Sequence, residues 1–412
     1  MNGIRKLFNS AGLHEWYYPL MMACYALTLL SFRIFRPGVF SAVLLVLIWI
    51  SLFTAGMMPK IKKDMDAADF VMGAWLLYSL FSGIWTVSFG IPFKVFLGEV
   101  FTTALPMGFY YAGKKGDKAR FYRNFILAVL AIGLLGLVLY ITAPKFYVDF
   151  LFEHEFISKA TVKTMRVRMV SVIGSTLMGY LSVVSMLLSS VFLIRAKGKQ
   201  GKAAFILSLF LAFMSNQRAA MVAAILVLIY LNCLLIFVYG LLGKKLFFAE
   251  CGGIICLFVL MLVFAPGALL KVYYRLVSLP GAVTERSDQW VGAANNLGNM
   301  WLGNGLGANG HRAIGFSEHV IADGGIAKLC CEMGIIGTSI FIFLLVLVLG
   351  RGIRHFRECS AELGVILITL LISIGSDTLS FALSVPVLYY CIGVVSATET
   401  VPAFLKPGEE SS

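Results

Sequence analysis

The apolar residues of this chain run in long, nearly uncharged stretches, unlike the short periodic patterns of soluble helices and strands. Examples are residues 40–53, 125–142 and 221–242. Several stretches reach the roughly 20 residues that an α-helix needs to cross about 30 Å of hydrocarbon. The pattern therefore predicts that most of the chain lies in a lipid bilayer as transmembrane helices.

Charged and turn residues divide these stretches into about twelve spans, which predicts an all-α polytopic membrane protein with residues 1–412 forming one domain. The predicted spans are 14–32, 38–56, 68–86, 91–112, 122–142, 169–194, 203–215, 218–240, 246–266, 325–350, 361–379 and 381–398. Two connections are too long to be simple turns, and long loops in compact folds are usually functional. The connection 143–168 carries charges without diagnostic spacing and is interpreted as a lid or acceptor surface. The larger connection 267–324, between the ninth and tenth spans, is where we expect the functional site.

Basic residues mark every second connection between the predicted spans. Each even-numbered connection contains Lys or Arg, from Lys60 in the second to Arg351 in the tenth, whereas the short odd-numbered connections near 87–90 and 380 contain neither. Short loops rich in Lys and Arg stay in the cytoplasm. The alternation predicts that both termini are cytoplasmic and that both long loops lie outside.

Composition narrows the classes of function. The chain is 59% hydrophobic and only 13% charged, which is more apolar than a soluble domain. Its net charge of +13 does not indicate a nucleic-acid partner, because the basic residues are not gathered into a stripe with exposed aromatic residues. The eight cysteines lack zinc-type or redox spacing, and no His, Asp and Glu cluster has the spacing of a metal site. We therefore expect neither a metal nor a cofactor.

Arg218 is the first candidate binding residue. A helix from Lys202 to Arg218 rises only about 24 Å, which puts Arg218, at the end of the polar run Ser215–Arg218, just below the outer surface. An unpaired guanidinium at that depth is costly, so an anion should face it. Either Arg218 snorkels to the headgroups or pairs with a carboxylate of the bundle, or it clamps a lipid-linked pyrophosphate.

The connection 267–324 supplies further candidates. Arg275 lies in a basic, tyrosine-rich segment near its start. Thr284 is predicted to cap a helix that places Arg286 and Trp290 on one face, where a guanidinium suits phosphate and an indole suits sugar stacking; a plain surface helix explains them almost as well. Gly303–Gly310 contains enough glycine for the backbone to approach a ligand closely, but it lacks the strand-then-helix context of a nucleotide-binding loop.

The connection closes with Arg312, His319 and Asp323. Asp323 is interpreted either as the N-cap of the tenth span or as a catalytic base, with His319 as the second candidate for the base. One turn into the tenth span, Lys328 and Glu332 are predicted to pair at four-residue spacing.

Three segments carry a family resemblance. Ser215–Ala220 is similar to a Ser/Arg/small-residue motif that opens a helix, and Arg286, Trp290 and Gly303–Gly307 are similar to a loop core. Asp323–Gly337 is similar to a closing motif in which His or Asp stands nine residues before Glu and glycines follow. In this order, with a long outer loop, they resemble the O-antigen polymerase and O-antigen ligase superfamily of integral-membrane glycosyltransferases, over roughly residues 200–350.

The resemblance implies that a glycan moves from undecaprenyl pyrophosphate to a hydroxyl of an incoming lipid-linked repeat, with inversion at the anomeric carbon and without a metal or nucleotide-sugar. It implies a multi-pass protein of the bacterial inner membrane, with a periplasmic active face and with a chain-length regulator and a flippase as partners. The implied substrate-binding residues are Arg218, Arg286, Trp290, Arg275 and Arg312, and the implied catalytic residues are Asp323 and His319.

Two details separate the branches of this superfamily. The ligase branch typically has His where this chain has Asp323, and the usual Asn partner is replaced by Gly324, so we expect a polymerase. A ligase that transfers glycan to lipid A-core is the alternative, with His319 supplying the imidazole. A lipid-linked oligosaccharide flippase or transporter is the non-enzymatic alternative, but it would place charges along a central cavity, whereas the predicted midplane holds little beyond Glu99 and Lys328.

Overall fold

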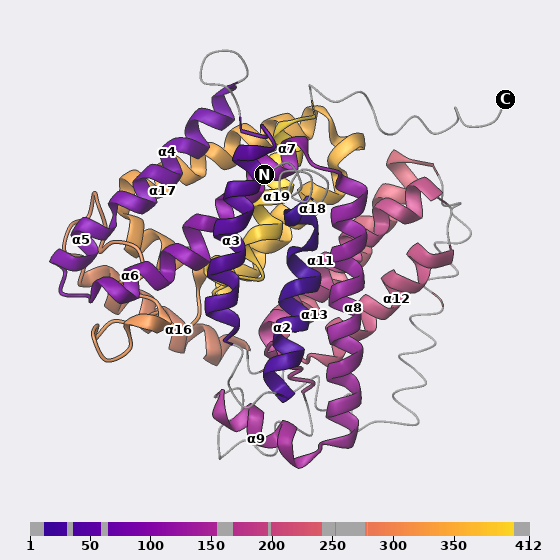
Figure 1. Cartoon of the computed structure of the whole chain (residues 1–412), viewed down its shortest axis with the longest axis horizontal. Coiled ribbons are helices and arrows are strands. Elements are labelled where there is room, and N and C mark those ends of the chain that lie inside the picture. Colours follow the sequence, from indigo (N-terminus) through magenta and orange to yellow (C-terminus); the bar gives the residue numbers. More distant parts are fainter. Residues whose placement is uncertain are drawn as a thin grey trace, which may run out of the picture.

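The computed structural model describes residues 12–30, 36–58, 65–154, 168–196, 199–240 and 279–398, together with positions 252 and 277. These residues form helices and connecting loops (Figure 1). Within them no strand occurs, and the β-type pairing is one isolated bridge between Ile314 and Ser317. The all-α prediction is confirmed for this part of the chain.

Helices of very different length make up the bundle. Up to residue 154 they are η1 (Leu13–Trp16), α2 (Tyr17–Leu30), α3 (Pro37–Thr54), α4 (Ala67–Phe81), α5 (Gly83–Ser88), α6 (Phe93–Glu99), the π-helical η2 (Val100–Ala104), η3 (Leu105–Met107), α7 (Gly108–Lys115), α8 (Lys118–Thr142) and α9 (Lys145–Glu153). After it come α11 (Ser175–Ala196), α12 (Lys199–Met214), α13 (Arg218–Cys233), the π-helical η5 (Leu234–Val238), α16 (Leu279–Asn295), η6 (His311–Ala313), α17 (Gly325–Arg354), α18 (Phe356–Gly375) and α19 (Val385–Ser396).

Seven helices within the described residues are long and apolar enough to cross a membrane: Pro37–Thr54, Ala67–Ser88, Lys118–Thr142, Ser175–Ile194, Arg218–Val238, Gly325–Arg354 and Phe356–Gly375. α12 and α19 are apolar but shorter. By length and composition the chain is therefore a multi-pass membrane protein. The predicted span 246–266 lies outside the described residues, so the count of twelve spans stays a prediction.

The predicted span 91–112 is not one continuous helix. The chain passes through α6, the π turn of η2 and the 3₁₀ turn of η3 before α7 begins. Pro106 has no amide hydrogen for a helical hydrogen bond, which favours a break at this point. The indole of Trp49 donates a hydrogen bond of 2.8 Å to the Leu105 carbonyl at the break. Hydropathy alone hides such a break, because both halves are apolar.

The two predicted outer connections also contain helices. α9 occupies Lys145–Glu153 of the first connection, and α16 occupies Leu279–Asn295 of the second, followed by irregular chain as far as Gly324. Residues 155–167 of the first connection and 267–276 of the second lie outside the described residues. Arg168, at the end of the first connection, is described. Both connections are thus partly helical and not open loops throughout.

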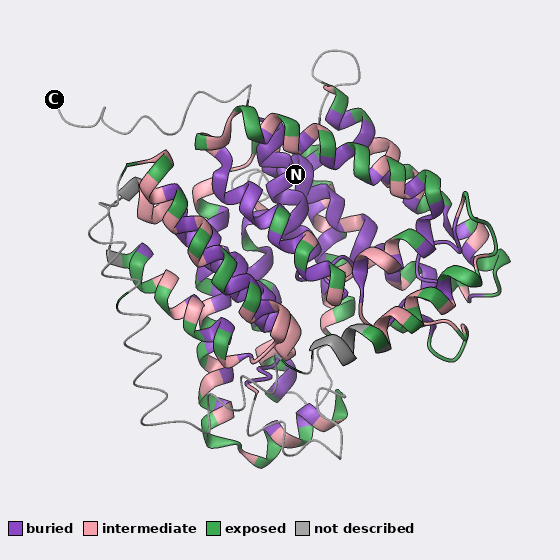
Figure 2. Ribbon diagram, turned by 180° about the vertical axis from the view of Figure 1, so that it is seen from behind, coloured by how far each residue is buried: buried purple, intermediate pink, exposed green. Residues whose placement is uncertain are grey.

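The core is centred on α11, which is buried on nearly all sides (Figure 2). Two of its serines have partners for their hydroxyls, since Ser182 donates to the Met178 carbonyl (2.7 Å) and Ser185 pairs with Ser208 of α12 (2.8 Å), whereas the Ser189 hydroxyl is buried without a hydrogen-bond partner among the described residues. α7 and α19 cross so closely that a β-carbon at Gly113 would lie 2.1 Å from the Tyr390 carbonyl oxygen. Glycine is required at this crossing.

An ionic cluster, the Lys114 cluster, closes one end of the bundle and consists of Asp66, Asp69, Lys114 and Arg351. Lys114 Nζ lies 2.8 Å from both Asp69 oxygens and 3.2 Å from Asp66, and Arg351 lies 2.6 Å from Asp66. Asp66 and Asp69 also form a capping box at the start of α4. Two carboxylates and two cations therefore satisfy one another around the start of α4.

α17 connects this Lys114 end to the opposite end of the bundle. Its 30 residues correspond to about 45 Å, and Arg351 lies near its last turn. α16, residues 296–324 and the start of α17 form the other end, here called the Arg286 end. Figure 1 shows α16 and α9 low in the view and α7 at the top. The Arg286 end contains five of the sequence-predicted site residues: Arg286, Trp290, Arg312, His319 and Asp323.

Candidate functional site

Arg286 and Trp290 lie one helical turn apart on α16 and both contact Asp323. Arg286 Nη2 lies 2.8 Å from Asp323 Oδ2, and the Trp290 indole N–H donates to the Asp323 carbonyl oxygen, also at 2.8 Å. The predicted shared face of these two side chains is confirmed. The predicted cap is wrong, because α16 begins at Leu279 and Thr284 lies inside it.

Asp323 does not cap the tenth span. The N-cap of α17 is Gly324, which makes no side-chain hydrogen bond, and the Asp323 carboxylate pairs with Arg286 instead. Gly324 has φ +123°, and a β-carbon there would lie 2.5 Å from the Trp290 indole nitrogen. Only glycine fits this conformation and this space. Trp290 therefore positions the Asp323–Gly324 backbone, and its indole N–H is occupied in doing so.

The glycine-rich stretch packs against α17, contrary to the expectation of a ligand-binding loop. α17 is interrupted at Gly334 (φ +60°), and the stretch donates hydrogen bonds to the backbone before this kink: Asn304 N to Cys331 O (3.0 Å) and Gly305 N to Glu332 O (2.8 Å). A β-carbon at Gly334 would lie 2.3 Å from the Gly303 nitrogen. The glycines therefore allow a close approach between loop and helix.

A second ionic cluster, the Lys328 cluster, lies behind this loop and consists of Glu99, Arg312, Lys328, Glu332 and Asp377. Lys328 Nζ contacts Glu99 Oε1, Asp377 Oδ2 (3.2 Å) and the Ser380 hydroxyl (2.7 Å). The predicted Lys328–Glu332 pair is wrong, because Lys328 pairs with these partners and Glu332 accepts from the Asn309 amide (3.1 Å). The cluster joins α6, α17 and the α18–α19 connection.

The Lys328 cluster contains more carboxylates than cations. Glu99 and Lys328 are each 3% exposed and Asp377 is 6% exposed, so their charges are largely hidden from water. Asp377 Oδ1 is buried without a hydrogen-bond partner among the described residues. Arg312 forms the open edge of the cluster, 41% exposed and 2.8 Å from Glu99 Oε2. Such an imbalance next to a surface is typical of a functional site more than of a structural ion pair.

Arg312 was grouped by sequence with Arg286, but the structure gives it different neighbours. Its Nη1 contacts Glu99, the Gly98 carbonyl (2.9 Å) and the Thr102 hydroxyl (3.0 Å).

His319 is held by a hydrogen bond from Asn309 to its carbonyl (2.8 Å), and its Nδ1 lies 3.7 Å from where a β-carbon of Gly292 on α16 would be. His319 therefore adjoins α16 without a contact to Asp323 among the described interactions. Arg275 lies outside the described residues.

Arg218 opens α13, as predicted, after Asn216 in a left-handed conformation (φ +46°). Farther along α13, Tyr230 donates to the Ser360 carbonyl of α18 (2.7 Å). A β-carbon at Gly375 would lie 3.3 Å from Arg286 Nη1. Arg286 therefore lies beside the end of α18.

Sequence reasoning did not bring the members of the Lys328 cluster together. Glu99 was noted only as a midplane charge, Lys328 was paired with Glu332, Arg312 was assigned to substrate binding, and Asp377 was not noted at all. The signal was present, since a carboxylate and an ammonium inside apolar stretches need partners and usually find each other. No groups of His, Cys, Asp and Glu that could hold a metal ion occur in the described part of the chain.

No protein-family model matches this sequence, and no curated protein matches it.

Proposed function

We propose that this protein is a glycosyltransferase that polymerises surface polysaccharide at the periplasmic face of the bacterial inner membrane, with the Arg286 end outward. The observation that carries the proposal is the Arg286–Asp323 pair. It presents a cation and a carboxylate 2.8 Å apart at a partly open surface, 27% and 47% exposed. Transfer of a glycan from a diphosphate to a hydroxyl requires a cation for the leaving diphosphate and a base for the hydroxyl proton.

The reaction defines the demands on these groups. The acceptor hydroxyl attacks the anomeric carbon of the donor glycan, and the bond between that carbon and the diphosphate oxygen breaks. The electron pair leaves with the diphosphate, and the hydroxyl proton passes to a base. Charge therefore builds on the diphosphate, where preorganised guanidiniums stabilise it through charge-assisted hydrogen bonds.

The geometry suggests a role for each side chain. The Arg286 contact with Asp323 uses Nη2, so Nη1, which points toward the end of α18, remains to meet a diphosphate oxygen. The Asp323 contact uses Oδ2, leaving Oδ1 to accept the hydrogen bond of an acceptor hydroxyl. Trp290 keeps Asp323 in place through the backbone. Arg218 supplies the second cation to the donor diphosphate.

The two alternative functions, a ligase and a transporter, require different residues. A ligase would use His319 as the base, and a lipid-linked oligosaccharide transporter would need charged side chains along a central path. The buried charged residues of the Lys114 and Lys328 clusters instead lie at the two ends of α17, and the buried polar residues of α11 are serines. This distribution favours a transferase over a transporter.

The test is Arg218→Ala in a strain that lacks the natural gene, scored on the lipopolysaccharide ladder. We expect the ladder to disappear with a single repeat still attached to core, because polymerisation stops and ligation continues. Loss of all repeats would instead favour a ligase or flippase, and a ladder of normal length would refute the role of Arg218. Arg354→Ala, an exposed arginine at the far end of α17, is the matched control, with protein level checked by immunoblot.

A further inference from the structure

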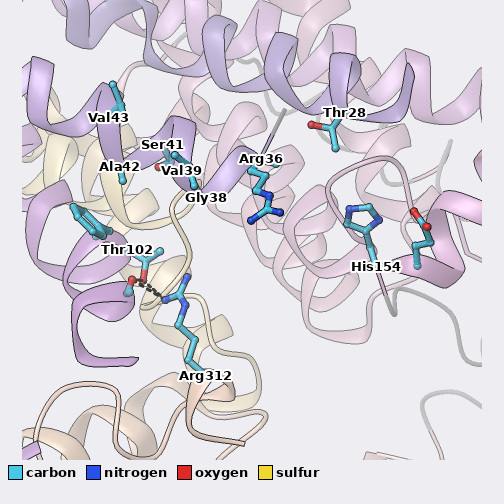
Figure 3. A pocket seen from close by; sticks show the side chains of 14 residues that line it. Thr28, Arg36, Gly38, Val39, Ser41, Ala42, Val43, Thr102, His154 and Arg312 are labelled. Atoms are coloured by element: carbon cyan, nitrogen blue, oxygen red, sulfur yellow. Dashed lines mark hydrogen bonds between the residues drawn. The ribbon is translucent and has the colours of Figure 1, made fainter. Parts of the chain in front are cut away.

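A cavity of about 780 Å³ opens beside the Lys328 cluster, with Arg312 in its wall. It lies between the start of α3, the α6–η2 segment and the end of α9 (Figure 3). This volume is within the range of about 300–1,000 Å³ found for small-molecule sites. The proposed transfer reaction does not yet use it.

Two arginines stand among the polar residues that line the cavity. Figure 3 shows Arg36 and Arg312 reaching into the same space, with His154 on another wall. Among the described lining residues, Glu153 contributes the one carboxylate. All hydrogen bonds of Arg312 to described residues use Nη1, so its Nε and Nη2 can still donate. Arg312 is already paired with Glu99, but Arg36 and the remaining N–H groups of Arg312 can donate to an anion with several oxygens.

The start of α3 adds to this preference for an anion. Arg36 is the N-cap of α3, makes no side-chain capping bond, and is followed by Pro37 in the first turn. The amides of Gly38 and Val39 therefore open toward the cavity without a cap, and the helix dipole places partial positive charge there. The arginines and the start of α3 therefore both favour an anion in the cavity.

The remainder of the lining is apolar and reaches the lipid-facing surface. Val39 and Val43 of α3 line the cavity and are 60% and 54% exposed, on a helix that is long and apolar enough to span the membrane. Phe101 and Ala42 line the cavity as well. An occupant with an anionic head and a hydrocarbon tail would satisfy both parts of the wall, whereas a soluble anion would leave the apolar part without a partner.

We propose that this cavity binds the diphosphate and first isoprenoid units of a second lipid-linked substrate, the acceptor repeat. The proposal rests on the proposed function, since transfer between two lipid carriers requires two diphosphate sites and Arg218 and Arg286 are both assigned to the donor. The Lys328 cluster connects the two places. Arg312 in the cavity wall pairs with Glu99, Glu99 with Lys328, and Lys328 with Asp377, which adjoins Gly325, two residues after Asp323.

The experiment is binding of undecaprenyl diphosphate to the full-length protein in nanodiscs, with stoichiometry read by native mass spectrometry. We expect two bound diphosphate lipids for the unmodified protein. Arg36→Gln should weaken one of them by about tenfold or more, as loss of a charge-assisted contact implies, and Arg218→Ala should weaken the other. Arg354→Gln is the control for loss of one positive charge. Arg36 is exposed, so its substitution should leave the fold intact.

Three results would overturn the proposal. These are a single bound diphosphate lipid, an Arg36→Gln protein that binds both lipids normally, and displacement by an equal amount of phosphatidylglycerol, which would make this an ordinary phospholipid site. The binding assay does not depend on transfer activity, so it tests the acceptor site separately from the proposed transferase function. If Arg218→Ala abolishes the ladder while Arg36→Gln binds normally, only the acceptor site falls. If Arg36→Gln loses a lipid while Arg218→Ala leaves a normal ladder, the assignment as acceptor falls with the proposed function.

Discussion

The two ionic clusters at the ends of α17 differ in how completely they are satisfied. In the Lys114 cluster two carboxylates face two cations, and Asp69 additionally accepts from Tyr110 (2.8 Å). In the Lys328 cluster three carboxylates face two cations, Asp377 Oδ1 has no partner among the described residues, and Arg312 borders a cavity. The first arrangement closes on itself, and the second leaves groups that can act on a ligand.

This difference separates a structural cluster from a candidate functional one. Buried ion pairs contribute little net stability but are costly to break, so a fully paired cluster mainly fixes how its helices pack. A cluster with unused donors and acceptors next to a surface is less stable than it could be, and functional sites commonly show this. The same residue types therefore predict different consequences of substitution at the two ends.

The largest expected effect is that of Lys328→Met. It leaves Glu99 and Asp377 buried without their common cation, so we expect the free energy of unfolding to fall by about 3–5 kcal/mol. Thermal unfolding in detergent, followed by fluorescence-detected size exclusion, measures the loss. Arg351→Met is the matched change at the Lys114 end. It should cost only about 1 kcal/mol, because Arg351 and Asp66 are partly exposed and Asp66 keeps Lys114. Equal losses at both ends would remove the distinction between the clusters.

Next comes Arg286→Lys, which keeps the charge but loses the planar fork of donors. We expect transfer to slow by about 10²–10³-fold, as when one preorganised donor to a developing anion is removed. The unfolding temperature should hardly change, since exposed pairs such as Arg286–Asp323 contribute about 0–1 kcal/mol. An assay with a purified lipid-linked repeat gives the rate. A stable Arg286→Lys protein with full activity would exclude Arg286 from the site, and the folded fraction of Arg351→Met should transfer normally.

Gly334→Ala tests whether the glycine-rich stretch is structural. The substitution forces a side chain into a left-handed conformation and against the Gly303 nitrogen, and we expect a loss of about 1–3 kcal/mol in stability. Gly350→Ala in the same helix has open space around it and should be neutral or stabilise by up to about 1 kcal/mol. The two unfolding temperatures form the comparison. A Gly334→Ala protein as stable as Gly350→Ala would show that the loop does not depend on this crossing.

The smallest effect concerns the pH dependence of the Lys114 end. Burial alone would raise the pKa of Asp66, but the Arg351 hydrogen bond, the Asp69 amide and Lys114 together lower it below 3.8. Because the folded pKa is depressed, the stabilisation is fully present above pH 3.8 and disappears as the pH falls through the lowered value. The unfolding temperature should be flat from pH 7 to 5 and decline below 3.8, with a shallower decline for Asp66→Asn. Parallel curves for the two proteins would contradict this.

Part of this protein could be read from short windows of sequence. The apolar spans 38–56, 122–142, 218–240 and 325–350 correspond to α3, α8, α13 with η5, and α17. Transfer of a helix into hydrocarbon is nearly a sum over its own residues, so a window of about 20 positions contains the information. The shared face of Arg286 and Trp290 follows from local spacing in the same way, since residues four apart on a helix are neighbours.

The remaining features depend on which segments meet, and no window contains both partners. Lys328 pairs with Glu99, 229 positions earlier, and not with Glu332 in the next turn. Asp323 pairs with Arg286, 37 positions earlier, instead of capping the start of α17. The glycine-rich stretch packs closely against α17. Local spacing offers a partner, but a buried charge pairs with the opposite charge that packing brings closest, because a buried charge left unpaired is costly. The sequence alone thus determined the membrane-embedded helices, and only the tertiary structure decided how their charges pair.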